Sequence, residues 1–192
     1  MNRSIVGFSL CLLFGAASDA AAQGFINPFV GTTLSSPSPN GSHSKAGFGL
    51  AFGKVGTAVG SEAEIAYYPE LLDNTGNALA KNRVLTFSGN LLVGPRIGRI
   101  KVYGAAGAGT LLLNVTSLKS VVTPNPERVS SNSFTVNAGG GVMGFVSGHF
   151  GIRGDLRYYR AFGINLSDLA SAGLALNHFD FWRANVGLVA TF

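Results

Sequence analysis

Apolar and small or polar residues alternate with a period of two along most of the chain after residue 23. In the segment 45–54, Phe48, Leu50 and Phe52 share one face of an extended chain, whereas the positions between them hold glycine and alanine. Such alternation, interrupted by stretches rich in turn-forming residues, predicts β-strands with one apolar face. Eight strands are predicted, approximately over residues 24–34, 45–54, 60–69, 84–94, 98–113, 133–146, 149–160 and 177–192.

The connections between these strands alternate strictly between long and short. The long ones follow the first, third, fifth and seventh strands and contain SSPSPNGSHS, ELLDNTGNALAKNR, NVTSLKSVVTPNPERVSSN and AFGINLSDLASAGLAL. The short ones lie around residues 55–59, 95–97 and 147–148. This rhythm is typical of an outer-membrane barrel, which has short periplasmic turns at one rim and long loops at the other. Both ends of the barrel domain are then expected at the periplasmic rim.

The first 22 residues have a different pattern. Arg3 precedes an apolar stretch of residues 5–17, and Ala20 and Ala22 fit an A-x-A cleavage site. The apolar stretch is too short for a spanning helix, which needs about 20 residues. We therefore expect a signal peptide over residues 1–22, Sec-type export, and a single mature domain over residues 23–192.

Composition favours the membrane over water. Charged residues make up 12% of the chain, whereas a soluble domain has about 25%. No run of 18 apolar residues follows Ala22, so a closed barrel is the structure that would satisfy the backbone in lipid. A soluble lipocalin-type barrel would turn its apolar side inward and cover its surface with residues such as Gly47, Gly49 and Ser88, which solvate poorly. The predicted fold is therefore an all-β, eight-stranded, antiparallel up-and-down transmembrane barrel.

The last predicted strand ends on an aromatic residue. Asn185, Gly187, Ala190 and Phe192 fit a pattern of a polar residue, Gly two positions later, and two apolar residues at the end. With the segments GFINPFVG, SEAEIAYYP, FSGNLL, VNAGGGVMGF and FGIRGDLRYY, this ending resembles the small outer-membrane β-barrel domain family, which is related in architecture to the OmpA and OmpX barrels. The resemblance implies that the barrel-assembly machinery reads the last strand as its address. It also implies contact with outer-membrane lipid, including lipopolysaccharide. The peptidoglycan-binding domain of OmpA-like proteins is not expected here.

Seven charged residues occupy the small or polar faces of the predicted strands, and we expect them in the lumen. They are Glu62, Glu64, Arg99, Lys101, Arg153, Asp155 and Arg157. Buried charges must be paired, because an isolated ion in a low-dielectric interior is costly. The third and seventh of eight strands face each other across the barrel axis, which predicts Glu62 and Glu64 at a height comparable with that of Arg153. Arg99 and Lys101 are expected at the same end, so that the network plugs the periplasmic half.

Candidate sites for other chemistry are weaker. Gly139, Gly141 and Gly144 match G-x-G-x-x-G, but they lie within a predicted strand and not before a helix, so we expect no cofactor. His43, His149 and His178 have no metal-ligand spacing, and no metal site is expected.

An enzymatic alternative stays open. Some small barrels remodel the acyl chains of lipid A with a His and a Ser, and His178 with Ser167 or Ser171 would supply a base and a nucleophile. An interior of eight strands is filled by side chains, which excludes a general diffusion porin.

The main functional hypothesis is a monomeric, non-enzymatic outer-membrane protein that contributes to envelope structure or surface interaction through its four long loops. A net charge of +5 does not indicate nucleic-acid binding. The alternatives are a lipid A acyl hydrolase or transferase and a narrow pore for small solutes. The sequence does not identify a binding partner for the loops.

Overall fold

The computed structural model describes residues 22–34, 44–69, 81–116, 128–162 and 179–192, so the expected signal peptide lies almost wholly outside the described residues. Within these ranges the chain forms eight long strands and one short one. They are β1 (Gln23–Thr33), β2 (Ala46–Val55), β3 (Val59–Pro69), β4 (Lys81–Val93), β5 (Arg96–Ile97), β6 (Ile100–Thr116), β7 (Arg128–Phe145), β8 (Phe150–Phe162) and β9 (Phe179–Thr191).

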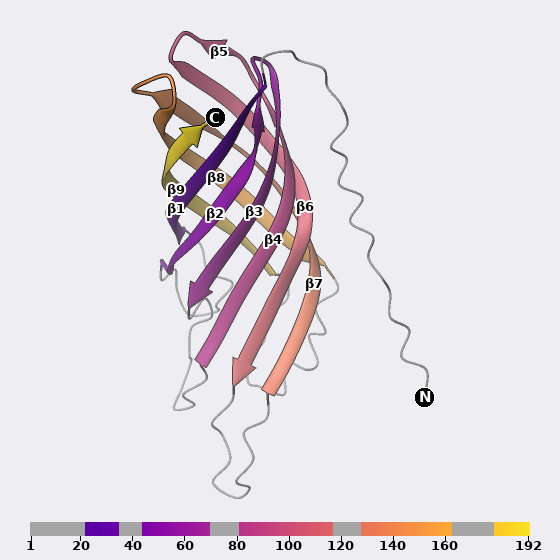
Figure 1. Cartoon of the computed structure of the whole chain (residues 1–192). Coiled ribbons are helices and arrows are strands. Elements are labelled where there is room, and N and C mark those ends of the chain that lie inside the picture. Colours follow the sequence, from indigo (N-terminus) through magenta and orange to yellow (C-terminus); the bar gives the residue numbers. More distant parts are fainter. Residues whose placement is uncertain (1–21, 35–43, 70–80, 117–127, 163–178) are drawn as a thin grey trace, which may run out of the picture.

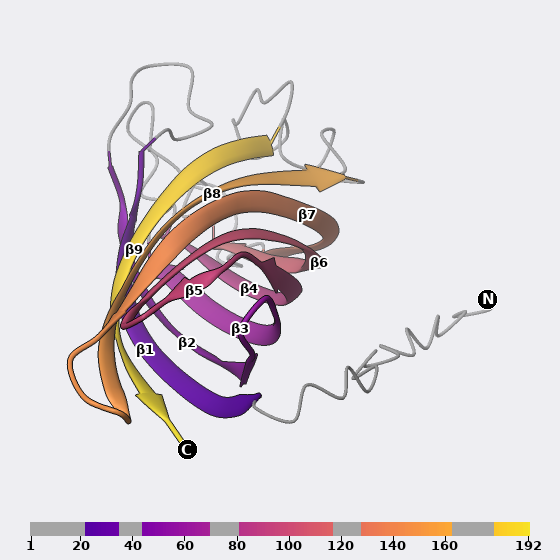
Figure 2. The same ribbon diagram turned by 90° about the horizontal axis from the view of Figure 1, so that it is seen from above.

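The sheet closes on itself, and all of its pairings are antiparallel. Each long strand pairs with its neighbours in the chain, with β4 and β6 paired past the short β5, and β1 pairs with β9 to complete the ring. Figures 1 and 2 show the strands curving around a common axis. Closure removes free sheet edges, so the backbone of the eight long strands finds its hydrogen-bond partners within the sheet, as a lipid environment requires. The predicted all-β, eight-stranded barrel is confirmed.

One rim of the barrel carries the short connections. Residues 56–58, the β5 hairpin and residues 146–149 lie at the upper end in Figure 1, where β1 begins and β9 ends. The connections between β1 and β2, β3 and β4, β6 and β7, and β8 and β9 leave from the opposite rim. In outer-membrane barrels the short-turn rim faces the periplasm.

The predicted limits of the strands over 98–113 and 133–146 are corrected. The strand expected from residue 98 begins at Ile100, because Gly98 and Arg99 form a two-residue turn between Ile97 and Ile100. Gly98 has φ of 61°, the positive value that a type II′ hairpin turn requires at its first central residue. At the other rim β6 and β7 extend farther than expected, since the ladder continues to the pair Thr116 and Arg128.

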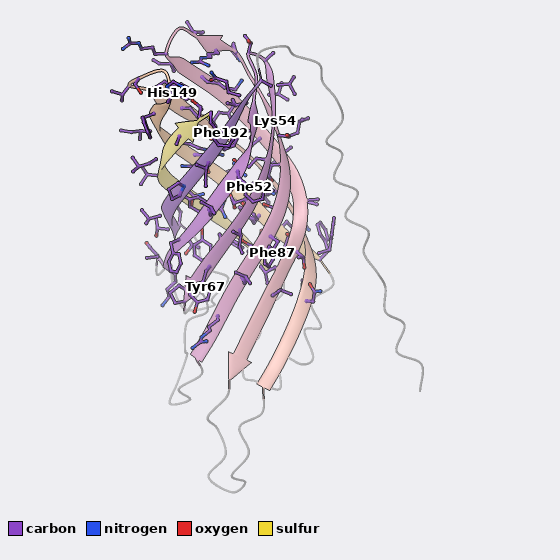
Figure 3. All side chains as sticks on the ribbon, in the orientation of Figure 1. Phe52, Lys54, Tyr67, Phe87, His149 and Phe192 are labelled. Carbon is purple, nitrogen blue, oxygen red and sulfur yellow. The ribbon has the colours of Figure 1, made fainter. Side chains whose placement is uncertain are left out.

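The exterior of the barrel is apolar. Phe48 and Phe52 on β2 and Leu188 on β9 are exposed, and the β2 neighbours of the two phenylalanines on the opposite face are glycine and alanine. Figure 3 shows Phe52 and Phe87 on the outside of the ribbon. Among the described residues no helix is long and apolar enough to cross a membrane. The exposed positions of Phe48, Phe52 and Leu188 show that the barrel turns its apolar side outward, the reverse of a soluble barrel.

Small residues on the inner face make room for large side chains that cross the lumen. A Cβ atom added to Gly49 would collide with the ring of Phe29 and with the carbonyl oxygen of Ile65. The absence of a side chain at Gly49 therefore leaves the space that the Phe29 ring occupies. The glycines on the inner faces have no side chains, and this leaves space in the lumen for long charged side chains from other strands.

Candidate functional site: the charged lumen

The lumen holds a network in which acids from β3 meet arginines from β8 and β9. Arg157 Nη2 donates a 2.8 Å hydrogen bond to Glu62 Oε1, and Arg153 Nη1 donates to the other oxygen of the same carboxylate. Glu64 lies two residues farther along β3 and contacts Arg183, whose Nη2 is 2.6 Å from Oε1 and 2.8 Å from Oε2. Ion pairs thus bridge the lumen between opposite walls.

Asp155 joins the two arginines of its own strand. Its carboxylate lies 3.0 Å from Arg153 Nε and 3.4 Å from Arg157 Nε. The Tyr103 hydroxyl accepts a 2.7 Å hydrogen bond from Arg153 Nε and donates to Asp155 Oδ2 at 3.3 Å. The Arg153 guanidinium is thus held by side chains from three strands, which are Glu62 from β3, Asp155 from β8 and Tyr103 from β6.

Neutral side chains complete the carboxylate shells. Asn90 Nδ2 donates to Glu62 Oε1 at 3.0 Å, and Asn137 Nδ2 in turn donates to Asn90 Oδ1 at 2.8 Å. Asn185 donates to Asp155 at 3.2 Å, and the Tyr159 hydroxyl donates to Glu64 at 3.2 Å. The network therefore receives side chains from six of the eight long strands.

Arg183 is a member that the sequence analysis missed. Its guanidinium lies 4.6 Å from the centroid of the Tyr159 ring and 5.5 Å from that of Phe29. Arg183 directly follows the exposed Trp182, so period-two alternation along β9 places Arg183 inward and was a signal that could have identified it. With Arg183 included, three acids face three arginines.

Burial makes these contacts energetically important. All six charged side chains of this network belong to residues no more than 8% exposed. Removing one member of a buried ion pair typically costs about 3 to 5 kcal/mol, because the partner is left unpaired. The lumen thus depends on its charges remaining matched.

Lys101 lies inside the barrel at the short-turn rim, as expected, whereas Arg99 does not lie where we expected it. Lys101 is buried, but its Nζ donates to the carbonyl oxygens of Gly56, Thr57 and Gly94 at 2.8, 3.1 and 3.0 Å, at the short-turn rim. Arg99 does not enter the lumen. It lies beyond the last ladder pair in the β5–β6 turn, where alternation no longer applies, and its side chain is exposed.

The ion pairs match the expected partners in part. We expected Glu62 and Glu64 at the height of Arg153, and Arg153 does pair with Glu62, but Glu64 pairs instead with Arg157 and Arg183. The stagger between neighbouring strands shifts the contacts along the axis.

The residues of the predicted assembly signal lie along the inner and outer faces of β9. Asn185 points inward to Asp155, and Gly187 lies against the side chain of Asn27. Ala190 is partly exposed, and the backbone of Phe192 exchanges two 2.9 Å hydrogen bonds with Gly24. Phe192 therefore completes the seam between β1 and β9.

The remaining candidate residues have diverse positions. His149 is exposed in a short turn, and Gly139, Gly141 and Gly144 lie within β7. Ala22 is exposed just before β1. His43, His178, Ser167, Ser171 and Ala20 lie outside the described residues.

A closed barrel with an apolar exterior and a charged interior is a transmembrane β-barrel. The chain belongs to the family of the outer membrane protein beta-barrel domain, whose family model matches residues 8–192. It is therefore a protein of the bacterial outer membrane.

Solved structures share the fold at low sequence identity. A major outer membrane protein from Thermus thermophilus is 12% identical, with a TM-score of 0.65 over 90% of this chain and 100% of that one. Neisserial surface protein A is also 12% identical, with a TM-score of 0.62 over 89% and 97%. Ail, the attachment invasion locus protein of Yersinia pestis, is 14% identical, with a TM-score of 0.53 over 89% and 97%. No curated protein sequence matches the chain.

Proposed function

We propose that this protein is a non-enzymatic, monomeric outer-membrane barrel that contributes to envelope structure or surface interaction through its four long connections. The observation that carries the proposal is the set of ion pairs that joins Glu62 and Glu64 to arginines across the lumen. A bridged lumen argues against solute passage as the main role. The connections at residues 34–45, 70–80, 117–127 and 163–178 then supply the surface for interaction.

Conductance in planar bilayers tests the bridged lumen. We expect the wild-type protein to show no regular channel steps. Arg157→Ala removes the side chain that contacts both Glu62 and Glu64, so we expect it to increase the conductance. Arg160→Ala is the matched control, because Arg160 is exposed on the same strand. Wild-type channels as large as those of Arg157→Ala would show that the protein is a pore.

Complementation of a deletion strain separates the two non-enzymatic roles. A variant in which the four long connections are replaced by Gly-Ser segments should restore detergent resistance if the barrel itself supports the envelope. If it reaches the membrane but does not restore the phenotype, the role lies in surface interaction. Release of labelled acyl chains from lipid A by the purified protein, lost in His178→Ala, would instead establish an enzyme.

We further propose that the mature protein begins at Gln23, the first residue of β1, after cleavage of a signal peptide over residues 1–22. Intact-mass analysis of protein from the outer membrane should show this N-terminus. A mass that includes Met1 would contradict cleavage.

A further inference from the structure

The short-turn rim of the barrel contains basic residues but no acidic residue. We define this rim as residues 22–24, 54–59, 94–101, 146–150 and 190–192, all of which the structure describes. It holds four of the chain's 14 basic residues and none of its nine acidic residues. The basic residues are Lys54, Arg96, Arg99 and Lys101. The three acids and three arginines of the lumen balance one another, and no acidic residue within this rim offsets its four basic residues.

Three of these four cations are available to a partner. Lys101 is buried and donates to three backbone carbonyl oxygens. Lys54 and Arg99 are exposed, and Figure 3 shows Lys54 at the rim end of the strand that carries Phe52. Arg96 is partly exposed, with its guanidinium 4.7 Å from the centroid of the Phe145 ring. Among the described residues, the ion pairs do not involve Lys54, Arg96 or Arg99.

Large apolar side chains surround the same rim. Ile97 is 70% exposed, Val146 71%, Phe150 66% and Phe192 78%. These side chains point away from the lumen and suit the hydrocarbon edge of a bilayer, where exposed apolar surface is removed from water. The cations are therefore placed beside the apolar band, at the depth of lipid headgroups.

Within the described ranges the opposite rim holds five basic residues and one acidic residue, which are Lys45, Lys81, Arg83, Arg128, Arg160 and Asp180. Arg83 and Arg160 are exposed there, but Asp180 lies on the neighbouring strand and accepts a 2.5 Å hydrogen bond from Tyr158. Arg160 lies over the ring of Phe162 at 5.6 Å. The opposite rim thus places an acidic residue beside its basic ones, whereas the short-turn rim holds basic residues without an acidic one.

We propose that the short-turn rim binds anionic phospholipid headgroups of the periplasmic leaflet through Lys54, Arg96 and Arg99. A phospholipid matches both features of the rim, since its phosphate pairs with the cations while its acyl chains cover the adjacent apolar side chains. An acidic protein in the periplasm would match only the charge. Each Lys or Arg near an anionic membrane surface contributes about fivefold to binding. The effect falls with salt because exposed charges are screened.

Lipid selectivity measured by electron paramagnetic resonance tests this proposal. The full mature protein is reconstituted in phosphatidylcholine vesicles that contain a trace of spin-labelled phosphatidylglycerol or spin-labelled phosphatidylcholine. We expect the protein to immobilise the phosphatidylglycerol label preferentially, with a preference that decreases in high salt. In Lys54→Gln/Arg99→Gln the preference should fall several-fold.

The matched control is Arg83→Gln/Arg160→Gln, which removes the same charge from the opposite rim. It should retain most of the preference. Folding of both double variants is first checked by the electrophoretic mobility of unheated protein. If Lys54→Gln/Arg99→Gln does not fold, the single variant Lys54→Gln replaces it in the experiment. Equal binding of the two labels by the wild type would overturn the proposal. An equal loss in the two double variants would also overturn it, because the preference would then reflect net charge alone.

Discussion

Arg157 shows how one residue's surroundings decide its role. It lies on the inner face of β8, is fully buried, and contacts the carboxylates of Glu62, Asp155 and Glu64. An isolated guanidinium in this position would be strongly destabilising, but three carboxylates and three guanidinium groups share the interior. The network is therefore stable as a set, and each member depends on the others.

The pair formed by Glu64 and Arg183 gives the clearest test of this dependence. Glu64→Gln and Arg183→Gln should each lower the free energy of unfolding by about 3 to 5 kcal/mol, because each leaves a buried charge with fewer partners. The double variant should cost less than the sum, since the two groups are in contact. Unfolding by urea in detergent micelles measures all three.

Arg160→Gln is the control, because this side chain is exposed on the outside of β8. Combined with Glu64→Gln it should give additive effects within about 0.5 kcal/mol. If the effects of Glu64→Gln and Arg183→Gln also add simply, the two side chains are not coupled and the geometry described for the lumen is wrong.

At the level of single residues, period-two alternation identified the inward charges well but not their partners. Glu62, Glu64, Arg153, Asp155 and Arg157 face the lumen as the alternation predicts. Arg99 does not, because it lies in a turn. The pattern fixes the face on which a side chain lies, whereas its height and its partner depend on the register of strands that are distant in sequence.

At the level of elements, the Lys101 side chain links β6 to the β2–β3 turn and to the β4–β5 connection. Lys101 leaves the inner face of β6 and donates to carbonyl oxygens of residues 56, 57 and 94. These carbonyl groups lie in connections, outside the ladder of the sheet. The ammonium group of Lys101 therefore supplies hydrogen-bond donors to three carbonyl groups outside the ladder of the sheet.

Lys101→Met keeps much of the aliphatic length but removes the ammonium group. Because buried acceptors would lose their donor, the free energy of unfolding should fall by about 1 to 3 kcal/mol. The connections at residues 56–58 and 94–99 should also become more sensitive to protease added from the short-turn side. Lys54→Met is the control, since Lys54 is exposed on β2. Equal protease resistance of Lys101→Met and the wild type would show that Lys101 does not hold the turns.

The whole molecule is closed by the seam between β1 and β9. Phe192 takes part with its backbone, through the hydrogen bonds to Gly24, while its side chain is exposed. An exposed aromatic side chain directly after the last strand fits the proposed role in recognition during assembly. The fold and the assembly role of Phe192 can therefore be tested apart.

Phe192→Ala keeps the backbone hydrogen bonds of the seam. We expect the purified variant to refold in detergent with nearly the stability of the wild type, whereas its amount in the outer membrane of cells should fall several-fold. Leu188→Ala is the matched control, because Leu188 is also exposed on the outside of β9. A normal membrane level of Phe192→Ala would show that the aromatic side chain is not part of an assembly address.

The sequence by itself determined the class of fold, the number of long strands and the face of each strand that meets lipid. It could do so because side-chain direction along a strand has a period of two, and because the alternation of long and short connections follows from an up-and-down order. Only the tertiary structure decided which charges are partners, including the pair of Glu64 and Arg183, and that Lys101 donates to the carbonyl groups of the turns. These features depend on strand stagger and on closure of the barrel, which bring residues such as Glu64 and Arg183 together from distant parts of the chain.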